Sequence, residues 1–401
     1  MARVGIYGGS FNPPHVGHSL AAREMTDRLG LDRLLIVPAA VPPHKALPDG
    51  SPGAADRLEL CRLAFAGIPK AEVCDLELRR EGPSYTIDTL RALHQSLPDD
   101  ELFLMMGTDM LLSFDLWRGP EEIAQLATLA VVRREESEAV WDEVRRKAAS
   151  LSRTLPARIV LVENRCVQVS STTVRRLLAL GAPWALEPAV ERMILERGWY
   201  LSGCDLKNLP FDRLSEISLS LHDEKRRPHV LGTSQTARAL ALRWGADPDL
   251  AARAGILHDI TKALGPSEQL HICRKYDMVL TELQRDNPKL LHAKTGAAVA
   301  RAVFGECEAV CEAIYWHTTG KANMSLLEKI IYIADYMEPN RSFPGVEILR
   351  SLVETDLDAA VFEGLDQSVR LLRKQGRIVD PDSLSAWRCY HPNKDREEQK
   401  A

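Results

Sequence analysis

The first residues whose types and spacing could do chemistry follow a short apolar run at the start of the chain. Residues 8–18 have the sequence GGSFNPPHVGH, with two glycines after a predicted strand and His15 and His18 at the start of a predicted helix. Glycines let the backbone approach a phosphate closely, and the free N–H groups of a helix N-terminus attract an anion. Because the histidines are three residues apart, both imidazoles can face that anion. The pattern predicts a phosphate site that is neither G-x-G-x-x-G nor a P-loop; the alternative is a tight turn with one surface histidine and one packed histidine.

Three later segments carry polar side chains that could serve the same site. Lys45 follows the second predicted strand and offers a cation, and Gly107 and Asp109 follow another strand, where a carboxylate suits a ribose or a metal. A late helix has Arg175 one turn from its start, which favours a second anion site at a helix N-terminus. Each segment alone is more simply a surface charge or a helix cap, but together they indicate one phosphate-binding edge. The hydroxyl residues that open the late helix are Ser170, Ser171 and Thr172.

The second half of the chain contains four histidines and two aspartates beside apolar residues. We expect His258 and Asp259 late in an apolar helix over 251–264, and Asp335 interrupts another apolar run. One such residue is usually a satisfied core group, but a buried carboxylate is costly unless it is paired or bound to a cation, and six such residues favour a metal site. Imidazole and carboxylate ligands indicate Fe, Mn, Zn or Co, and one bridging carboxylate would suit two metals about 3.5–4 Å apart. The six residues are His229, His258, Asp259, His292, His317 and Asp335.

The elements that must position these residues differ between the two halves. In the first half, short apolar runs alternate with stretches of helical spacing, which predicts a doubly wound, Rossmann-like parallel sheet with ligands beyond the carboxyl ends of the strands. After Gly203 the strand signal ends, and the rest is expected to be all-α. Asp247 and Asn287, each followed by proline, and Ser325, followed by Glu328 in a capping box, are expected to cap helix starts. We expect domains over 1–200 and 212–390, a linker over 201–211 and a polar tail over 391–401. The predicted strands cover 3–7, 33–37, 102–106, 129–132 and 158–162, and the predicted helices between them cover 16–29, 54–66, 86–97 and 135–151.

Composition limits the function classes. The chain has 401 residues, a net charge of −5 and 45% hydrophobic residues, which excludes a disordered chain and a small disulfide scaffold. The near balance of charge argues against a nucleic-acid partner, and no apolar run reaches the roughly 18–20 residues that a bilayer span needs. Eight cysteines without a C-x-x-C pair predict reduced thiols and a cytoplasmic protein. His222, His271 and His391 lie near charges or turns and are expected to be solvated.

The first half resembles the bacterial nicotinate-nucleotide adenylyltransferases, within the H-x-G-H nucleotidyltransferase superfamily. The resemblance covers residues 3–200 and rests on GGSFNPPHVGH, on PPHK over 42–45 and on VSSTTVR over 169–175. Ser19, Val169 and Val174 are its small departures. It implies transfer of the adenylyl group of ATP to nicotinate mononucleotide, with Mg²⁺ on the phosphates. The implied catalytic residues are His15, His18, Lys45 and Arg175; the implied binding residues are Gly8, Gly9, Ser10, Phe11, Thr86, Gly107, Asp109, Trp117, Ser170, Ser171 and Thr172.

The second half resembles the HD phosphohydrolases, in particular the bacterial HD-domain hydrolases that split diadenosine tetraphosphate symmetrically into two ADP. The resemblance covers residues 212–390 and rests on the order His, His-Asp, Asp, on HTTG over 317–320 and on ADYMEPNR over 334–341. It implies two divalent metals, iron first and Mn, Zn or Co as alternatives. His229, His258, Asp259 and Asp335 would hold one metal, and His292 and His317 with Asp259 the other. Lys262 and Arg341 would neutralise the polyphosphate, and Thr318 would contact the nucleotide.

The sequence as a whole therefore predicts a bifunctional enzyme of NAD biosynthesis and nucleotide hydrolysis. Two alternatives remain for the second half, which could hydrolyse another nucleotide or act as a nucleotide-sensing regulator of the transferase. For the first half, the acceptor could instead be the amidated mononucleotide or phosphopantetheine. No nucleic-acid or membrane partner is expected, and a homo-oligomer is left open.

Overall fold

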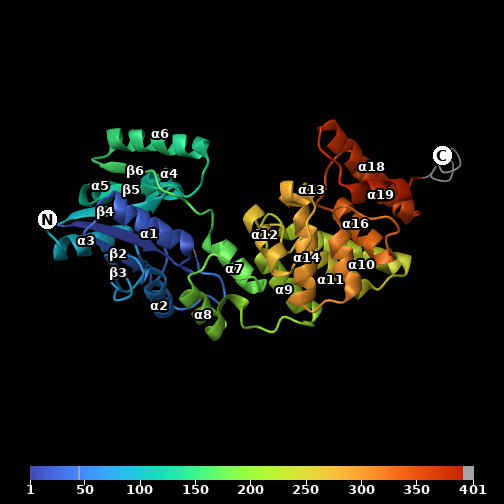
Figure 1. Cartoon of the computed structure of the whole chain (residues 1–401), viewed down its shortest axis with the longest axis horizontal. Helices are drawn as coiled ribbons and strands as arrows, with labels where there is room; N and C mark the ends of the chain where they lie inside the picture. The colour runs from blue at the N-terminus through green and yellow to red at the C-terminus, as the bar shows by residue number, and fades with distance from the viewer. Residues whose placement is uncertain (44–45, 392–401) are drawn as a thin grey trace. The chain divides into compact units, whose positions relative to one another are not determined.

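The computed structural model describes residues 1–43 and 46–391, and its chain forms two compact units (Figure 1). Unit 1 comprises Met1–Ala179 and Pro183–Cys204; unit 2 comprises Leu180–Ala182 and the chain from Asp205 onward. Lys45 and residues 392–401 of the predicted polar tail over 391–401 lie outside the described residues. None of the helices in the described part of the chain is long and apolar enough to cross a bilayer.

Unit 1 is built on one parallel six-stranded sheet, as predicted. The strand order is β3-β2-β1-β4-β5-β6. Successive strands are therefore added outward on one side of β1 up to β3 and on its other side from β4 onward, so the order of addition reverses between β1 and β4. Ile6 of β1 pairs with Leu35 on one side and Leu104 on the other. Ligands of doubly wound sheets bind at this reversal, beyond the carboxyl ends of the strands. The strands are β1 Arg3–Gly9, β2 Arg33–Pro38, β3 Ala71–Val73, β4 Glu101–Gly107, β5 Thr128–Val132 and β6 Ile159–Val162.

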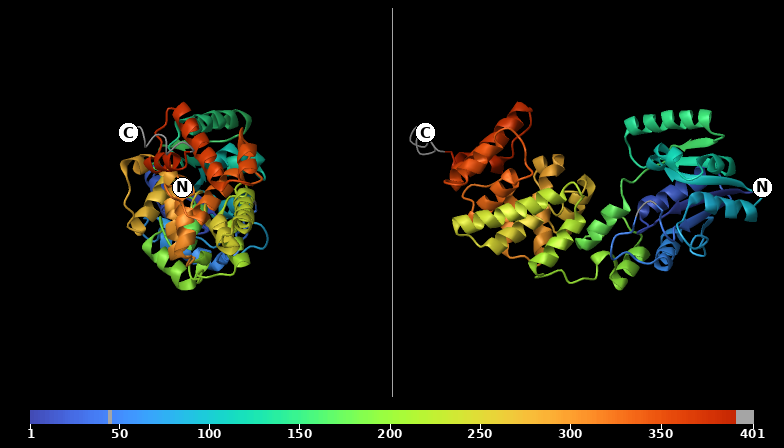
Figure 2. Two further views of the ribbon diagram at one scale, coloured as in Figure 1. Left: turned by 90° about the vertical axis from the view of Figure 1, so that its right-hand side faces the viewer. Right: turned by 180° about the vertical axis from the view of Figure 1, so that it is seen from behind.

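Helices cover both faces of this sheet (Figures 1 and 2). The four predicted helices and five predicted strands are present with ends shifted by a few residues. β3, α4, α5 and α8 were not predicted, and the first three are only three to seven residues long. Short elements carry too few periods for the pattern to register. The helices are α1 Val16–Arg28, α2 Ala54–Phe65, α3 Thr86–Ser96, α4 Thr108–Leu112, α5 Pro120–Leu126, α6 Glu138–Thr154, α7 Ser171–Ala179 and α8 Pro188–Arg197, with 3-10 turns η1 Phe114–Leu116 and η2 Trp199–Leu201.

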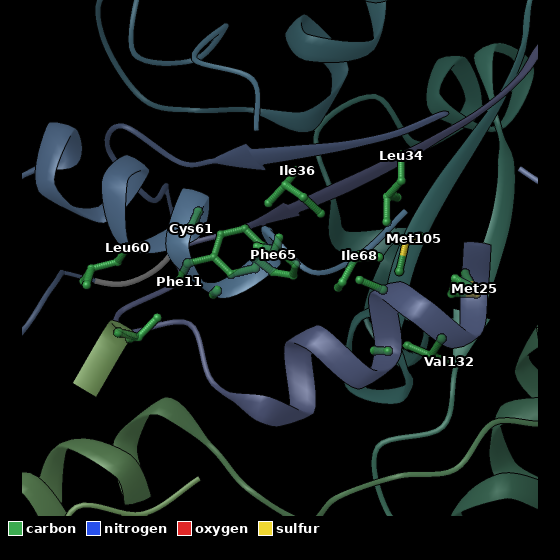
Figure 3. Packing of buried hydrophobic residues seen from close by; sticks show 14 of the residues in the cluster. Phe11, Met25, Leu34, Ile36, Leu60, Cys61, Phe65, Ile68, Met105 and Val132 are labelled. Carbon is green, nitrogen blue, oxygen red and sulfur yellow. The ribbon is translucent and has the colours of Figure 1, made fainter. Parts of the chain in front are cut away.

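Alternation along the strands divides the core of unit 1 into two layers. In β2, Leu34 and Ile36 point to one face and Leu35 to the other, because successive side chains of a strand alternate. Phe11 joins the first layer and packs against Phe65, with ring centroids 5.6 Å apart (Figure 3). The loop after β1 is thereby anchored to the core by its own aromatic side chain.

Unit 2 is all-α in its described residues, in agreement with the prediction. Two predicted helix starts are present, because Asp247 accepts hydrogen bonds from the N–H groups that open α11, and Ser325 and Glu328 form a capping box at α16. Asn287 was predicted to cap a helix in the same way, but it makes no side-chain cap and precedes only the 3-10 turn η3 Pro288–Leu290. The helices are α9 Phe211–Leu221, α10 Arg227–Trp244, α11 Pro248–Leu257, α12 Pro266–Lys275, α13 Glu282–Asp286, α14 Leu291–Ala302, α15 Glu308–Trp316, α16 Leu326–Met337, α17 Val346–Leu352, α18 Leu357–Lys374 and α19 Pro381–Cys389.

The predicted helix over 251–264 is too long at its C-terminal end. α11 ends at Leu257, so His258 is its C-cap residue and Asp259 lies in the turns that follow. The apolar spacing continues past Leu257 although the helix does not; His258 keeps helical backbone angles (φ −52°, ψ −37°), and Asp259 is placed by the turns that follow.

Candidate active sites

The loop between β1 and α1 forms the floor of a cavity of about 360 Å³ in unit 1. Gly8, Gly9 and Ser10 line it, and a Cβ on Gly9 would lie 3.2 Å from the Phe11 ring, so only glycine fits there without a shift. The buried guanidinium of Arg57 donates to the Ser10 carbonyl at 2.7 Å and to the Ala40 carbonyl at 3.0 Å. Core packing and these bonds fix the loop before any ligand arrives.

His15 and His18 stack on each other beside this loop, with ring centroids 3.7 Å apart. His15 is 2% exposed, and within the described residues neither of its ring nitrogens has a hydrogen-bond partner. Burial, with Arg134 nearby, lowers the pKa of His15 to about 3, and burial also places the pKa of His18 well below its usual range. A buried polar group without a partner is unfavourable by about 1–3 kcal/mol. The pair is therefore built to receive a ligand.

Cationic side chains complete the wall of this cavity. Arg175 in α7 donates to the Asn12 carbonyl at 2.6 Å and to the Thr172 hydroxyl at 3.0 Å. Arg134 and Arg165 also line the cavity, although sequence reasoning did not single them out. Arg134, in the Arg133-Arg134 pair after β5, and Arg165, beyond the end of β6, belong to no recognised motif, so these positions could be recognised only from the fold.

A second cavity of about 340 Å³ shares Gly8, Gly9 and Ser10 with the first. Its other walls include the half-buried aromatic side chain of Trp117 and the N-terminus of α3 at Thr86. Two cavities that meet at one glycine-rich loop can hold two nucleotides with their phosphates adjoining. The loop would supply backbone N–H groups at the junction.

The sequence-predicted residues of unit 1 divide between these two cavities. Asp109 lies in the second cavity and pairs with Arg134 at 3.1 Å. Ser170 lines neither cavity; its hydroxyl accepts from the Thr173 N–H at 3.1 Å and caps α7. Lys45 lies outside the described residues. The remainder line the first cavity, namely Gly8, Gly9, Ser10, Phe11, His15, His18, Gly107, Ser171, Thr172 and Arg175, or the second, namely Thr86 and Trp117.

In unit 2, the Asp259 carboxylate stands between two pairs of imidazoles. Its Oδ2 lies 3.4 Å from His258 Nε2 and 3.6 Å from His229 Nε2. Its Oδ1 lies 3.4 Å from His292 Nε2 and 3.6 Å from His317 Nε2. One carboxylate thus presents one oxygen to each pair, which is the arrangement of a bridging ligand.

Asp335 completes the first of the two groups. Its Oδ1 lies 3.1 Å from His229 Nε2 and 3.7 Å from His258 Nε2. The ligand atoms of His229, His258 and Asp335 lie close enough to one another to share one metal, as do those of His258, Asp259 and His317. All six predicted residues are brought together in one cluster.

Hydrogen bonds orient all four imidazoles toward this cluster. The Nδ1 atoms of His258, His292 and His317 each lie 2.6–2.7 Å from the carbonyl oxygen three residues earlier in the chain. His229 Nδ1 lies 3.1 Å from the buried carboxylate of Glu338. A proton held at Nδ1 leaves the Nε2 lone pair for a metal. The donor set and its orientation therefore fit divalent metals, and Glu338 is a functional neighbour that sequence reasoning missed.

The charges of the cluster compensate one another. Burial opposes ionisation of Asp259, but His258 and the other imidazoles hold its pKa well below the usual range. Burial also opposes protonation of His229, yet Asp259 and Asp335 raise its pKa to about 9. Burial, together with Lys262, lowers the pKa of His292 to about 3. Metal binding requires neutral imidazoles, so His229 must lose a proton when a metal binds.

Three cations close the cluster on the side of a cavity of about 670 Å³, here called the cluster cavity. Arg226 contacts Asp259 Oδ2, Arg341 donates to Asp335 Oδ1 at 2.6 Å, and Lys262 Nζ lies 2.8 Å from His292 Nε2. Thr318, also on this wall, places its hydroxyl 3.1 Å from His292 Nε2. Arg226 was not singled out from sequence because it lies 33 residues from its partner Asp259.

The expectation that His222 is solvated is wrong. Its side chain is 2% exposed, with Nδ1 2.7 Å from the Ser218 carbonyl and Nε2 3.1 Å from the Asp259 carbonyl. α9 packs against α11 and carries His222 under the turn that holds Asp259. The ring supports that backbone and is not directed at the ligand atoms.

Comparisons with known proteins give separate matches for the two units. A cytidylyltransferase-like family model matches residues 6–177, and an HD domain model matches residues 226–340. The chain is 39% identical over 202 residues to a Shouchella clausii protein named "probable nicotinate-nucleotide adenylyltransferase", covering 50% of this chain and 97% of that protein. It is 41% identical over 165 residues to a Halalkalibacterium halodurans protein named "bis(5'-nucleosyl)-tetraphosphatase, symmetrical", covering 41% of this chain and 88% of that protein.

A solved structure described as a predicted HD superfamily hydrolase involved in NAD metabolism, from Clostridium acetobutylicum, is 36% identical. It covers 45% of this chain and 97% of its own, with a TM-score of 0.44. The HD domain match implies a divalent-metal site, and the ligand groups of unit 2 supply one.

Proposed function

The chain belongs to the nicotinate-nucleotide adenylyltransferases in its N-terminal half and to the symmetrical bis(5'-nucleosyl)-tetraphosphatases in its C-terminal half, and we propose that it carries out both reactions. For unit 1, the observation that supports the proposal is a pair of cavities meeting at the glycine-rich loop. For unit 2, it is the Asp259 carboxylate between two imidazole pairs.

In the transferase reaction, a phosphate oxygen of nicotinate mononucleotide attacks the α-phosphorus of ATP. A new P–O bond forms, the bond between the α- and β-phosphates breaks, and pyrophosphate leaves with the electron pair. The substrate supplies the nucleophile, so the protein needs only to position the two nucleotides and to stabilise the transition-state charge. We assign ATP to the first cavity and the mononucleotide to the second, beside Thr86 and Trp117.

The roles of the first-cavity residues follow from their contacts. His15 would donate to the ATP phosphates from a ring nitrogen that has no partner among the described residues, and His18, whose Nδ1 accepts from the His15 N–H at 3.2 Å, would donate from Nε2. Arg175 would stabilise the charge that develops on the leaving pyrophosphate. Arg57 touches only backbone carbonyls and acts as a positioning residue for the loop. Lys45 keeps its predicted role on the phosphates as a proposal.

We assign the Mg²⁺ of this reaction to ATP itself. Among the described residues, the histidine and carboxylate groups that could hold a metal lie in unit 2. Mg²⁺ usually keeps several waters and is bound largely through substrate phosphates, so it needs no cage of protein ligands. Asp109, paired with Arg134 in the second cavity, is the nearest candidate for a substrate ribose.

The transferase assignment is tested by supplying ATP with nicotinate mononucleotide, nicotinamide mononucleotide or phosphopantetheine. We expect deamido-NAD and pyrophosphate as the main products, with nicotinate mononucleotide the preferred acceptor. Preference for either of the other acceptors would overturn the assignment while leaving the nucleotidyltransferase fold in place.

In the hydrolase, His229, His258 and Asp335 would hold one divalent metal and His292 and His317 the other, with Asp259 shared. Metals bound there would withdraw charge from the phosphates and acidify a water. Imidazole and carboxylate donors support iron first, with Mn, Zn or Co as alternatives. The donors alone do not distinguish these metals, so metal analysis of anaerobically purified protein is the decisive measurement.

We propose diadenosine tetraphosphate as the substrate of this site. Water attacks one of the two central phosphorus atoms, the central P–O bond breaks, and two ADP and two protons result. The tetraphosphate would be held by the three cations that line the cluster cavity next to the metal-ligand residues, namely Arg226, Lys262 and Arg341. Thr318 would orient the phosphate next to His292.

Product analysis with diadenosine tetraphosphate tests the hydrolase assignment. ADP as the sole nucleotide product would support symmetrical cleavage. ATP together with AMP would contradict it, because that outcome requires attack at an outer phosphate. Metal-loaded protein that leaves the dinucleotide intact would favour another nucleotide as the substrate.

A further inference from the structure

A further cavity of unit 2 adjoins the cluster cavity. It measures about 660 Å³ and is lined by α16, α18 and the loop between α16 and α17; we call it the outer cavity. Asp335, Tyr336, Arg341 and Leu371 line both the outer cavity and the cluster cavity. The two cavities therefore meet at one of the metal-ligand residues and at the cation paired with it.

The walls of the outer cavity have the chemistry of a nucleobase site. Phe343 is half-buried and packs edge-on against Tyr336, with ring centroids 5.7 Å apart and an interplanar angle of 88°. Leu371 adds an apolar side chain, 54% exposed, and Gln367 adds an amide. A base can stack on an aromatic face, and an amide can bond to its polar edge. Arg341 stands between this surface and the metal ligands, where phosphates would pass.

The form of the proposed substrate requires two such places. A tetraphosphate cut at its centre has two nucleoside arms of equal length, which extend from the reacting bond in opposite directions. The cluster cavity, lined by segments between Arg226 and Ser383, can take one arm. The second arm needs an extension that begins at the same metal ligands, and the outer cavity begins at Asp335 and Arg341.

We propose that the outer cavity binds the second nucleoside of the dinucleoside tetraphosphate, with its base against Phe343 and its phosphates along Arg341. This inference rests on the proposed hydrolase function of unit 2. It makes Phe343 a specificity residue for dinucleotides over mononucleotides, and each cavity then holds one of the two ADP products after cleavage.

The test compares two substrates that differ only in the second nucleoside, diadenosine tetraphosphate and adenosine 5'-tetraphosphate. Phe343→Ala should lower kcat/KM for the dinucleotide by about tenfold, which corresponds to about 1.4 kcal/mol. The value for adenosine tetraphosphate, or its inhibition constant if it is not cleaved, should stay within about twofold. Phe343→Trp should restore dinucleotide turnover, because an indole offers the same stacking face.

Ile348→Ala is the matched control, since Ile348 is 51% exposed on α17 and lines neither cavity. Thermal unfolding and metal content of each variant separate loss of folding from loss of the subsite. An equal loss with both substrates, or no loss with either, would overturn the inference. Failure of the unaltered protein to cleave the dinucleotide would instead count against the proposed function.

Product binding gives a readout that does not depend on turnover. Calorimetric titration of the metal-loaded protein with ADP should show one site fewer in Phe343→Ala than in the unaltered chain. Any ADP held by unit 1 is common to both proteins and cancels in the comparison. The same number of sites with the same affinities in both proteins would contradict a nucleoside at Phe343.

Discussion

The two units hold phosphate-binding groups in opposite states. Among the described residues of unit 1, both ring nitrogens of His15 are buried without partners, and Arg175 is bonded only to the neutral oxygens of Asn12 and Thr172. In unit 2 the groups are buried and paired with one another, so that Asp259 alone contacts four imidazoles and Arg226. A loop that follows a central strand can be fixed by backbone hydrogen bonds and core packing. Charged side chains that helices bring together must instead compensate each other's charge. The site in unit 1 can bind its ligand as it stands. The cluster in unit 2 must lose protons and break its ion pairs with cationic side chains before metals can bind.

The largest effect that tests this contrast is expected for Asp259→Ala. The substitution removes a ligand of both proposed metals, and it leaves four imidazoles without their central anion. Single groups that stabilise transition-state charge are worth about 100–1,000-fold, so we expect hydrolysis to fall by more than about 1,000-fold, with metal content falling as well. Transferase kinetics should not change. Asp249→Ala is the control, because Asp249 is 75% exposed at the start of α11 and lines neither the cluster cavity nor the outer cavity.

Hydrolysis that survives Asp259→Ala with full metal content would remove the bridging role. A simultaneous change in transferase kinetics would favour the regulatory alternative for unit 2.

The corresponding change in unit 1 is His18→Ala. Its ring is stacked on His15 and touches the cavity, so we expect kcat/KM of the transferase to fall by about 100–1,000-fold, as for loss of one transition-state donor. The melting temperature should fall only slightly, because the His18 ring makes a single hydrogen bond to the described protein, which Nδ1 accepts from the His15 N–H at 3.2 Å. His94→Ala, at an exposed histidine on α3, is the control. A large loss of stability with unchanged kcat/KM would make the histidine pair structural.

A smaller effect is expected for Glu338→Gln, which tests the orientation of His229. Glu338 is 1% exposed and contacts His229 Nδ1, and loss of such a partner lowers metal affinity or activity by about 10–100-fold. Competition with a chelator measures the affinity directly. Glu347→Gln, at a carboxylate that is 78% exposed, supplies the baseline. Equal chelator resistance in both variants would show that Glu338 has no part in metal binding.

The smallest effect is a proton linkage in unit 1. Without ligand, the pKa of His15 is about 3, below its value of about 6.5 in an unfolded chain. A bound polyphosphate raises this pKa, so ATP binding should take up protons and strengthen as pH falls from 8 to 6, by at most tenfold per unit for one group. By the same sign, His15 makes the fold less stable as pH falls below about 6.5, since the unfolded state then binds the extra proton.

Calorimetry of ATP binding in buffers with different ionisation enthalpies measures this uptake. The difference between the unaltered chain and His15→Gln isolates the imidazole from the protons of ATP itself. Equal uptake in the two proteins would mean that His15 stays neutral beside the phosphates.

The contrast between the units also explains which features sequence reasoning could find. The strands of unit 1 and the helix caps at Asp247 and Ser325 were predictable because each depends on residues within a few positions of one another. Two family resemblances carried the reaction classes, and the comparisons confirm both. β3 and the early end of α11 were missed, because three residues give no periodicity and apolar spacing continues past Leu257.

The sequence by itself determined the order of the two domains, their fold classes and the identities of the six residues that meet in unit 2. Only the tertiary structure decided which oxygen of Asp259 faces which imidazole pair, and that Glu338, 109 residues from His229, holds that ring. It also decided that Arg57, 47 residues from Ser10, fastens the glycine-rich loop. Local patterns arise from backbone geometry between near neighbours, whereas these pairings depend on how distant elements pack.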